Sequence, residues 1–437
     1  MRKNIKDVSW GSGMLALSPI LVFLVLYLVT SIVIGDFYKM PLSIAMLVAT
    51  IWSAFTLKGR SLSERIEIFS KGASASNIMY MVWIFILAGA FASVAKLTGA
   101  VDATVSVALD LLPPSLLVPG LFITTCFISM SIGTSVGTVV ALTPLAVEMA
   151  NSAGASVPYF VAIVLGGAFF GDNLSFISDT TIAATRTQGC NMKDKFFANI
   201  RIVVPAAIIA LILYCVNSPA LTVSYYSDNS SPWLMIPYLI VIVLAVFGLN
   251  VIVVLLVGII SACIGGLIKG IDIISLCTSG GEGIDSVGNL IIITLLASGM
   301  LSMIKEAGGI DFLLNVLNRK MKNSKTAQFG IVFLVSVVNL CTANNTVAII
   351  TVGSMVKKIS SNYNISPRRS ASLLDTGACI TQALIPYGAQ GLMASALAGI
   401  SPAQPWLYLY YPQILILTLV ISIFLSSRSE KNRRALD

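Results

Sequence analysis

The sequence predicts an all-α integral membrane protein with about ten transmembrane helices, two re-entrant hairpins, and inverted-topology repeats that contain broken helices. Of the 437 residues, 57% are hydrophobic and only 11% are charged, and the mean hydropathy is +0.91. Most of the chain must therefore face lipid or other apolar helices. Two further observations refine this fold class: polar residues interrupt two of the apolar runs, and short segments recur in the second half of the chain.

Apolar runs of membrane length define the helices in order. The first run, 14–34, follows a basic segment, but it is too long for the apolar region of a signal peptide and has no small-residue cleavage site. We expect it to be retained as a helix. The later runs are 40–57, 78–98, 115–150, 158–185, 198–217, 234–249, 250–268, 288–307, 328–356, 370–398 and 408–425.

Two of these runs are predicted to be re-entrant hairpins. The run 328–356 is too short for two spans of about 20 residues each, and the polar segment 341–346 interrupts it. The run 115–150 has a similar interruption at 131–138. Hairpins whose tips lie within the membrane account for both patterns, because irregular backbone is tolerated at that depth where it is buried or lines a cavity.

Lysine and arginine are concentrated on one side of this layout. Of 27 such residues, 23 lie in six segments, which by the positive-inside rule places both termini in the cytoplasm. Lys96 and Lys305 lie near span ends and are expected to anchor their helices at the interface; the alternative is that they take part in coupling. The run Arg186–Arg201 is expected to be a solvated loop. The six segments are 1–13, 58–77, 186–201, 308–327, 357–369 and 426–437.

The hairpins belong to an internal repeat whose loop charges are reversed. The loop before the first copy, 58–77, carries four basic residues, whereas the matching loop 270–287 carries none. The loop after the first copy carries none, whereas its matching loop, 308–327, carries four. This reversal is typical of an inverted repeat. Matching segments are Lys96–Asp102 with Lys305–Asp311 at an offset of 209, Gly137–Val139 with Asn345–Val347 at 208, and Gly167-Ala168 with Gly377-Ala378 at 210.

The predicted divisions are an N-terminal two-helix segment 1–77, a first repeat 78–217, connecting helices 218–287, a second repeat 288–425 and a tail 426–437.

Two carboxylates, Asp172 and Asp179, lie inside the apolar stretch Val157–Ala184. A charge at bilayer depth costs at least about 2.5 to 3.5 kcal/mol on insertion scales, and the neighbouring polar residues would break a helix there. We expect Asp172 to be the leading ligand for a cation such as Na+ and the leading proton acceptor, with Asp179 second. Alternatively, both acids only cap the broken helix. The polar neighbours that would complete the shell, or instead hydrogen-bond the helices together, are Asn173, Ser175, Ser178, Thr180 and Thr181.

The hairpin tips and the second broken helix complete the predicted site. An offset of 210 aligns Asp172 with Gln382, so only the first repeat keeps the carboxylates. Asp375 is expected to be either an interfacial partner of Arg369 or a proton relay, and Gln382 and Gln390 either contact the solute or bridge helices. The tip residues, which could instead only satisfy local backbone, are Thr134, Ser135, Thr138, Asn344, Asn345 and Thr346.

The residue types present argue against several other functions. The chain has no histidine, which removes Ser-His and Cys-His catalysis and the commonest zinc ligand. Its seven cysteines are scattered without a CxxC pair, so metal and disulfide roles are weakly supported. No nucleophile–base set points to an enzyme. The net charge of +8 comes mainly from loops that orient the protein in the membrane, which argues against nucleic-acid binding.

The segment Gly171–Ser175, followed by Ser178–Thr181, resembles the signature of the NhaC family of sodium/proton antiporters within the ion transporter superfamily. The resemblance covers most of the chain through its two repeats. It implies a multi-pass carrier of the bacterial cytoplasmic (inner) membrane, often homodimeric, that couples sodium to protons or to a small organic solute. Three positions depart from the pattern of antiporter members: Asn173 replaces a common Lys, Phe176 a common Pro, and Ile182 a common Asn.

These observations predict a secondary active transporter that exchanges Na+ for H+ by alternating access, with no cofactor. A cation and a proton that compete for one carboxylate would couple the two fluxes. The alternative is a sodium- or proton-coupled carrier of an amino acid or small organic acid, whose carboxylate the tip Asn344–Thr346 could bind. A passive channel is disfavoured, because dead-ended hairpins make no continuous pore.

Overall fold

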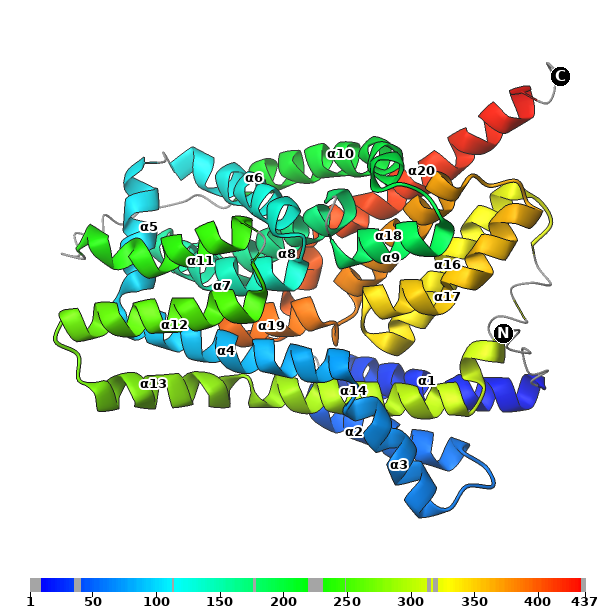
Figure 1. Cartoon of the computed structure of the whole chain (residues 1–437), viewed down its shortest axis with the longest axis horizontal. Coiled ribbons are helices and arrows are strands. Elements are labelled where there is room, and N and C mark those ends of the chain that lie inside the picture. Colours follow the sequence, from blue (N-terminus) through cyan, green and yellow to red (C-terminus); the bar gives the residue numbers. More distant parts are fainter. Residues whose placement is uncertain are drawn as a thin grey trace.

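The computed structural model describes residues 9–34, 41–111, 114–175, 178–218, 231–247, 249–312, 316 and 321–433. Within these ranges all regular secondary structure is helical (Figure 1), as the fold class predicts. The first half of the chain contains α1 (Trp10–Ile34), α2 (Leu42–Thr56), α3 (Leu62–Ala73), α4 (Ser76–Thr98), α5 (Ala100–Leu111), α6 (Pro114–Ile132), α7 (Ser135–Ser152), α8 (Val157–Leu174), α9 (Asp179–Gln188) and α10 (Met192–Val216).

The second half follows the same order. It contains η1 (Pro232–Met235), α11 (Ile236–Val246), α12 (Val251–Ile268), α13 (Ile273–Ser286), α14 (Gly288–Glu306), α16 (Ser324–Thr342), α17 (Asn345–Asn362), α18 (Pro367–Leu384), α19 (Ala389–Ala398), η2 (Gln404–Tyr408) and α20 (Tyr410–Arg433).

Four consecutive helices recur at one constant offset. The bounds of α16, α17, α18 and α19 are those of α6, α7, α8 and α9 plus 210. The starts of α12 and α13 are those of α2 and α3 plus 209 and 211, so helices outside the two predicted repeats follow the same pattern. The constant offset pairs Ser135 with Asn345 at the hairpin tips. The predicted pairing of Gly137 with Asn345 was therefore wrong by two residues, because a similar triplet is too short to determine the register.

Both predicted hairpins form. The turn between α6 and α7 contains Gly133 at φ 72°, and the turn between α16 and α17 contains Ala343 at φ 46°. Each tight reversal thus places one residue in the left-handed region, which glycine tolerates best. The α6–α7 hairpin lies on the left of Figure 1 and the α16–α17 hairpin on the right. The two hairpins therefore enter the molecule from opposite ends, as an inverted repeat requires.

Two helices are broken, as predicted. Ser175 follows the end of α8 and Ile385 follows the end of α18, both with extended backbone, and Ser178 and Gly388 precede the short helices α9 and α19. The short helix α9 packs against α17, whereas α19 packs against α7. Each half-helix thus contacts the hairpin of the other half of the chain, so the two repeats together form the centre of the molecule.

Small residues bring each hairpin close to its broken helix. A Cβ atom at Gly171 would lie 2.1 Å from Oγ of Ser129, so α6 and α8 approach closely there, as small residues permit in membranes. The hydroxyl of Ser129 donates to the carbonyl of Ala168 at 2.7 Å, and Nδ2 of Asn339 donates to the carbonyl of Ala378 at 2.7 Å. These two contacts are related by the same offset of 210, which repeats the hydrogen bond as well as the helices.

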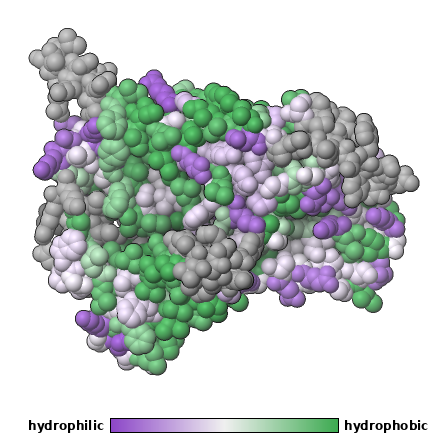
Figure 2. Space-filling model, turned by 180° about the vertical axis from the view of Figure 1, so that it is seen from behind, coloured by the Kyte–Doolittle hydropathy of each residue, from purple (hydrophilic) through white to green (hydrophobic). Residues whose placement is uncertain are grey.

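Lipid-facing surface is extensive. Six helical stretches in the described ranges are long and apolar enough to cross a membrane, and shorter apolar helices such as Leu42–Thr56 add to them. On α12, exposed Val253, Leu256, Ile260 and Ile264 follow helical spacing, and Figure 2 shows broad apolar areas on one face of the molecule. The protein is therefore a multi-pass membrane protein.

Candidate ion-binding site

Asp172 lies on the last turn of α8, at the point where both hairpin tips meet. Its side chain is 4% exposed. The carboxylate accepts hydrogen bonds from the backbone N–H of Ser135 at 3.0 Å, from the Ser135 hydroxyl at 2.5 Å and from Nδ2 of Asn345 at 3.4 Å. Ser135 and Asn345 are the first residues of α7 and α17. Two helix N-termini, the positive ends of their dipoles, therefore adjoin one buried acid.

The donors around Asp172 are all neutral. Among the described residues, no lysine or arginine nitrogen lies within ion-pair distance of this carboxylate. Neutral hydrogen bonds and helix ends reduce the cost of burying the charge, but they do not cancel it. The carboxyl group is therefore suited to hold an exchangeable positive charge, either a proton or a metal cation.

The hydroxyl groups of the break bind backbone carbonyls. Ser178 and Thr180 donate to the carbonyl of Asp172 at 2.9 and 3.2 Å, and Thr181 donates to the carbonyl of Ser175 at 2.9 Å. Ser178 also caps α9 by accepting from the backbone N–H of Thr181. These contacts satisfy the carbonyls that the end of α8 leaves unpaired. The structure thus gives these side chains a capping role beside the Asp172 carboxylate.

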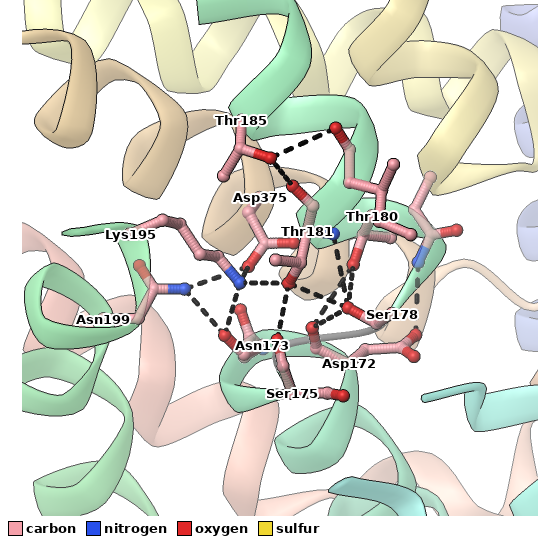
Figure 3. Close-up of polar contacts among 12 residues, drawn as sticks. Asp172, Asn173, Ser175, Ser178, Thr180, Thr181, Thr185, Lys195, Asn199 and Asp375 are labelled. Atoms are coloured by element: carbon pink, nitrogen blue, oxygen red, sulfur yellow. Dashed lines mark hydrogen bonds and ion pairs between the residues drawn. The ribbon is translucent and has the colours of Figure 1, made fainter. Parts of the chain in front are cut away.

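Lys195 and Asp375 form a fully buried ion pair on the other side of the break (Figure 3). The Nζ of Lys195 lies 2.6 Å from Oδ2 of Asp375, and both side chains are 0% exposed. Lys195 also donates to the carbonyl of Asn173 at 2.7 Å and to the hydroxyl of Thr181 at 2.6 Å. Asn199, one turn along α10, donates to the same carbonyl and to Asp375 at 2.8 and 2.9 Å. The pair links α8, α9, α10 and α18.

If Asp172 and Asp375 are both ionised and Lys195 is protonated, this buried region carries one net negative charge. Lys195 neutralises Asp375, whereas Asp172 has no counter-ion among the described residues. One monovalent cation at Asp172 therefore makes the region neutral.

Two glutamines connect the second broken helix to Asp172. Nε2 of Gln382 donates to the tip carbonyl of Ala343 at 3.0 Å and to Oε1 of Gln390 at 2.9 Å, and Nε2 of Gln390 donates to the Ser135 hydroxyl at 2.8 Å. Gln382 occupies the position equivalent to Asp172 in the second repeat. Both glutamines bridge elements, one of the two roles expected for them.

The remaining tip residues contact the site less directly. Asn344 caps α17 by accepting from the backbone N–H of Val347 at 2.9 Å. Thr138 donates back to the carbonyl of Thr134 at 3.0 Å. Thr346 is half-buried. Of the six tip residues, only Ser135 and Asn345 hydrogen-bond Asp172.

Asp179 lies beside this cluster, between Ser178 and Thr180, which both contact the carbonyl of Asp172. It is the first residue of α9, its side chain is exposed, and it makes no ion pair within the described part of the chain. The N-terminus of α9 favours its charge. Asp375 is a second fully buried acid in this region, and the predicted role of Asp179 as second ligand stays a prediction.

One expectation about basic residues was wrong, and one of the two alternatives given for Asp375 is not found. The run Arg186–Arg201 is not a solvated loop, because α9 ends at Gln188, α10 begins at Met192, and Lys195 is buried. Arg369 does not pair with Asp375; it donates to Oε1 of Gln328 and to the hydroxyl of Ser422, both at 2.9 Å. A signal for Lys195 was present in the sequence. Lys195, Asn199, Val203, Ala206 and Ala210 recur at helical spacing and form the buried face of α10.

Paired hairpins that meet at broken helices around a buried acid define a membrane carrier. The chain belongs to the Na+/H+ antiporter family, whose model matches residues 7–218 and again residues 215–427. The two matches fall on the two halves of the chain that share a helix order.

Several relatives match most of the chain. It is similar to the malate-2H+/Na+-lactate antiporter of Bacillus subtilis (20% identity; 91% of this chain and 92% of that protein). It is also similar to the Na+/H+ antiporter NhaC of the same organism (25%; 82% and 85%) and to the arginine/ornithine antiporter ArcD of Halobacterium salinarum (24%; 81% and 80%). A solved YdaH transporter of Alcanivorax borkumensis matches with a TM-score of 0.41 and 14% identity over 93% of this chain and 97% of that one.

Proposed function

We propose that this protein exchanges Na+ for H+ and that Asp172 is the group that carries them alternately. The observation that supports this most is a fully enclosed carboxylate whose donors are all neutral. Such a group is stable when protonated or when it binds a cation, and costly when it is bare. Because one carboxylate cannot hold both ions at once, entry of one ion requires release of the other.

Both loaded forms of the site have the same total charge. With Lys195 neutralising Asp375, Asp172 plus one proton and Asp172 plus one Na+ are each neutral. In the Na+ form, the Ser135 hydroxyl beside the carboxylate would be an oxygen ligand, and a flip of the Asn345 amide, whose nitrogen faces Asp172, would supply a second. In either neutral form, Asp172 can pass from access on one side of the membrane to access on the other through the apolar interior. The bare carboxylate does not make this change, because its charge is costly in that environment.

Alternating access would come from motion of the hairpins against the broken helices. Each half-helix packs on the opposite hairpin, so movement of one repeat against the other changes the exposure of Asp172 toward one side or the other. We further infer a bacterial cytoplasmic membrane with both termini in the cytoplasm. The 23 basic residues in six segments support this orientation.

A second candidate function is coupled transport of a small organic acid or amino acid. The malate/lactate and arginine/ornithine antiporters among the relatives favour it, and a cavity of about 410 Å³ lies between α1, α2, α14 and α19, within the size range of small-molecule sites. Tyr27, Ser286, Asn289, Ser395 and Ser401 supply its polar groups, and none of its lining residues is basic. The cavity therefore lacks a charged partner for an organic anion.

Purified protein in proteoliposomes with an internal pH dye tests the proposal. An inward Na+ gradient should drive proton efflux without any added solute, in wild type and in Asp179→Asn, but not in Asp172→Asn at matched protein levels. The amide cannot release a proton and has no charge for Na+. Proton flux that appears only when malate, lactate or arginine is present would favour the second candidate, and sodium-driven flux in Asp172→Asn equal to wild type would contradict the assignment of Asp172.

A further inference from the structure

We propose that Lys195 is a tethered cation, whose ammonium group permanently occupies a second site for a monovalent cation in the break between α8 and α9. Three buried oxygens surround its Nζ: the carbonyl of Asn173 at 2.7 Å, Oγ1 of Thr181 at 2.6 Å and Oδ2 of Asp375 at 2.6 Å (Figure 3). A backbone carbonyl at a helix break, a hydroxyl and a carboxylate are the ligand types that bind Na+ in carriers with broken helices.

The three ligands come from three elements that have other reasons to converge. Asn173 lies one residue before the end of α8, where carbonyls lack helical partners and carry the negative end of the dipole. Thr181 lies in the first turn of α9, and Asp375 lies midway along α18. The pocket is thus formed by the break itself, and α10 contributes the ammonium group that fills it.

Unpaired buried oxygens beside Lys195 also indicate a cation-binding environment. Oδ1 of Asn173 and Oδ1 of Asn199 are buried and have no hydrogen-bond partner among the described residues. Asn199 already touches Asp375 and the Asn173 carbonyl through its amide nitrogen. Rotation of this amide would present an oxygen to the same point, so a small ion placed there would find additional ligands.

The position of Lys195 on α10 argues against a simple anchoring role. It is the fourth residue of the helix, where the dipole disfavours a cation. A lysine that anchors a helix reaches water, as exposed Lys193 does two residues earlier. Lys195 instead points inward and is 0% exposed, so its burial is explained by the oxygens that it contacts.

Occupation of this site by lysine limits the number of mobile cations. With Asp375 neutralised, Asp172 is the buried acid of this described cluster that remains for exchange, and removal of the ammonium group should open a second Na+ site. The consequence for stoichiometry rests on the proposed function, whereas the occupation of the site by Lys195 does not. A test of binding therefore separates the two.

The test measures the melting temperature of purified protein in detergent, in NaCl and in choline chloride at equal ionic strength. The Asp172→Asn background removes the exchange site. Adding Lys195→Met should create a Na+-dependent upward shift in melting temperature, because an ion that binds only the folded protein stabilises it. Adding Asp375→Asn as well should abolish this shift. Lys193→Met in the same background is the matched control and should show none.

Equal melting temperatures of Asp172→Asn/Lys195→Met in the two salts would overturn the proposal. If this variant folds in NaCl but not in choline chloride, Na+ replaces the ammonium group and the proposal holds. If it folds in neither salt while the triple variant with Asp375→Asn folds in both, Na+ does not replace the ammonium group and the proposal fails. Failure of the proposed function would appear differently, as a Na+-induced shift that persists in Asp172→Asn alone.

Discussion

Breaking the buried pair of Lys195 and Asp375 should strongly destabilise the protein, whereas removing both charges should not. In Lys195→Met, Asp375 keeps only neutral donors, among them Asn199 at 2.9 Å. In Asp375→Asn, Lys195 keeps two oxygens, from Asn173 and Thr181. An uncompensated buried charge costs about 3–5 kcal/mol. We therefore expect each single variant to lose about that amount, with Lys195→Met at the upper end.

A double-mutant cycle measures the coupling between these two residues. Unfolding by SDS in mixed micelles, in choline chloride without Na+, gives the free energy for wild type, both single variants and Lys195→Met/Asp375→Asn. The double variant has no unpaired charge, so its loss should be far smaller than the sum of the single losses, with a coupling energy of at least about 3 kcal/mol. Lys193→Met is the exposed control and should change stability by less than about 0.5 kcal/mol. Additive losses would refute the buried ion pair.

Three further outcomes are expected. Gly171→Ala should lower the free energy of unfolding by about 1–3 kcal/mol in the same assay, because its Cβ would lie 2.1 Å from Oγ of Ser129. Unchanged stability would refute the close contact of α6 and α8. Asn345→Ala should raise the half-saturating Na+ concentration several-fold, since it removes a contact to Asp172, whereas Thr346→Ala should not; equal kinetics in both variants would limit the tip to a structural role. On a cysteine-free background, Ser63→Cys should be shielded from an impermeant thiol reagent outside intact cells and Ile274→Cys should react; the reverse pattern would contradict the orientation.

Local sequence features were sufficient to locate the hairpins, the breaks and Asp172. Polar residues inside apolar runs are costly in lipid, so the segments around Thr134, Asn344 and Asp172 stood out without any knowledge of contacts. The structure places these three segments together. The inverted arrangement was also predictable, because loop charge alone records which side of the membrane each loop occupies.

Long-range partners were not predictable from one sequence. Lys195 and Asp375 are far apart in the chain, and each had a plausible local interpretation, one as a loop residue and one as a partner of Arg369. Only the packing of α10 on α18 brings them together. The helical spacing of the small and apolar residues that follow Lys195 on α10 could have shown that Lys195 faces inward. It could not have shown which acid Lys195 contacts. The role of Asp179 as a second ligand stays a prediction, because the local sequence does not show how the break directs its side chain.

Proton release on sodium binding tests most directly whether one carboxylate exchanges the two ions. Calorimetric titration of purified protein with NaCl, in buffers of different ionisation enthalpy, counts the protons released per bound Na+. Wild type and Asp179→Asn should approach one proton per sodium ion as the pH is lowered, with an affinity for Na+ that weakens by roughly tenfold per pH unit in that range. Asp172→Asn should bind no Na+ and release no proton. Sodium binding to wild type without proton release at any pH, or undiminished release from Asp172→Asn, would contradict competition at Asp172.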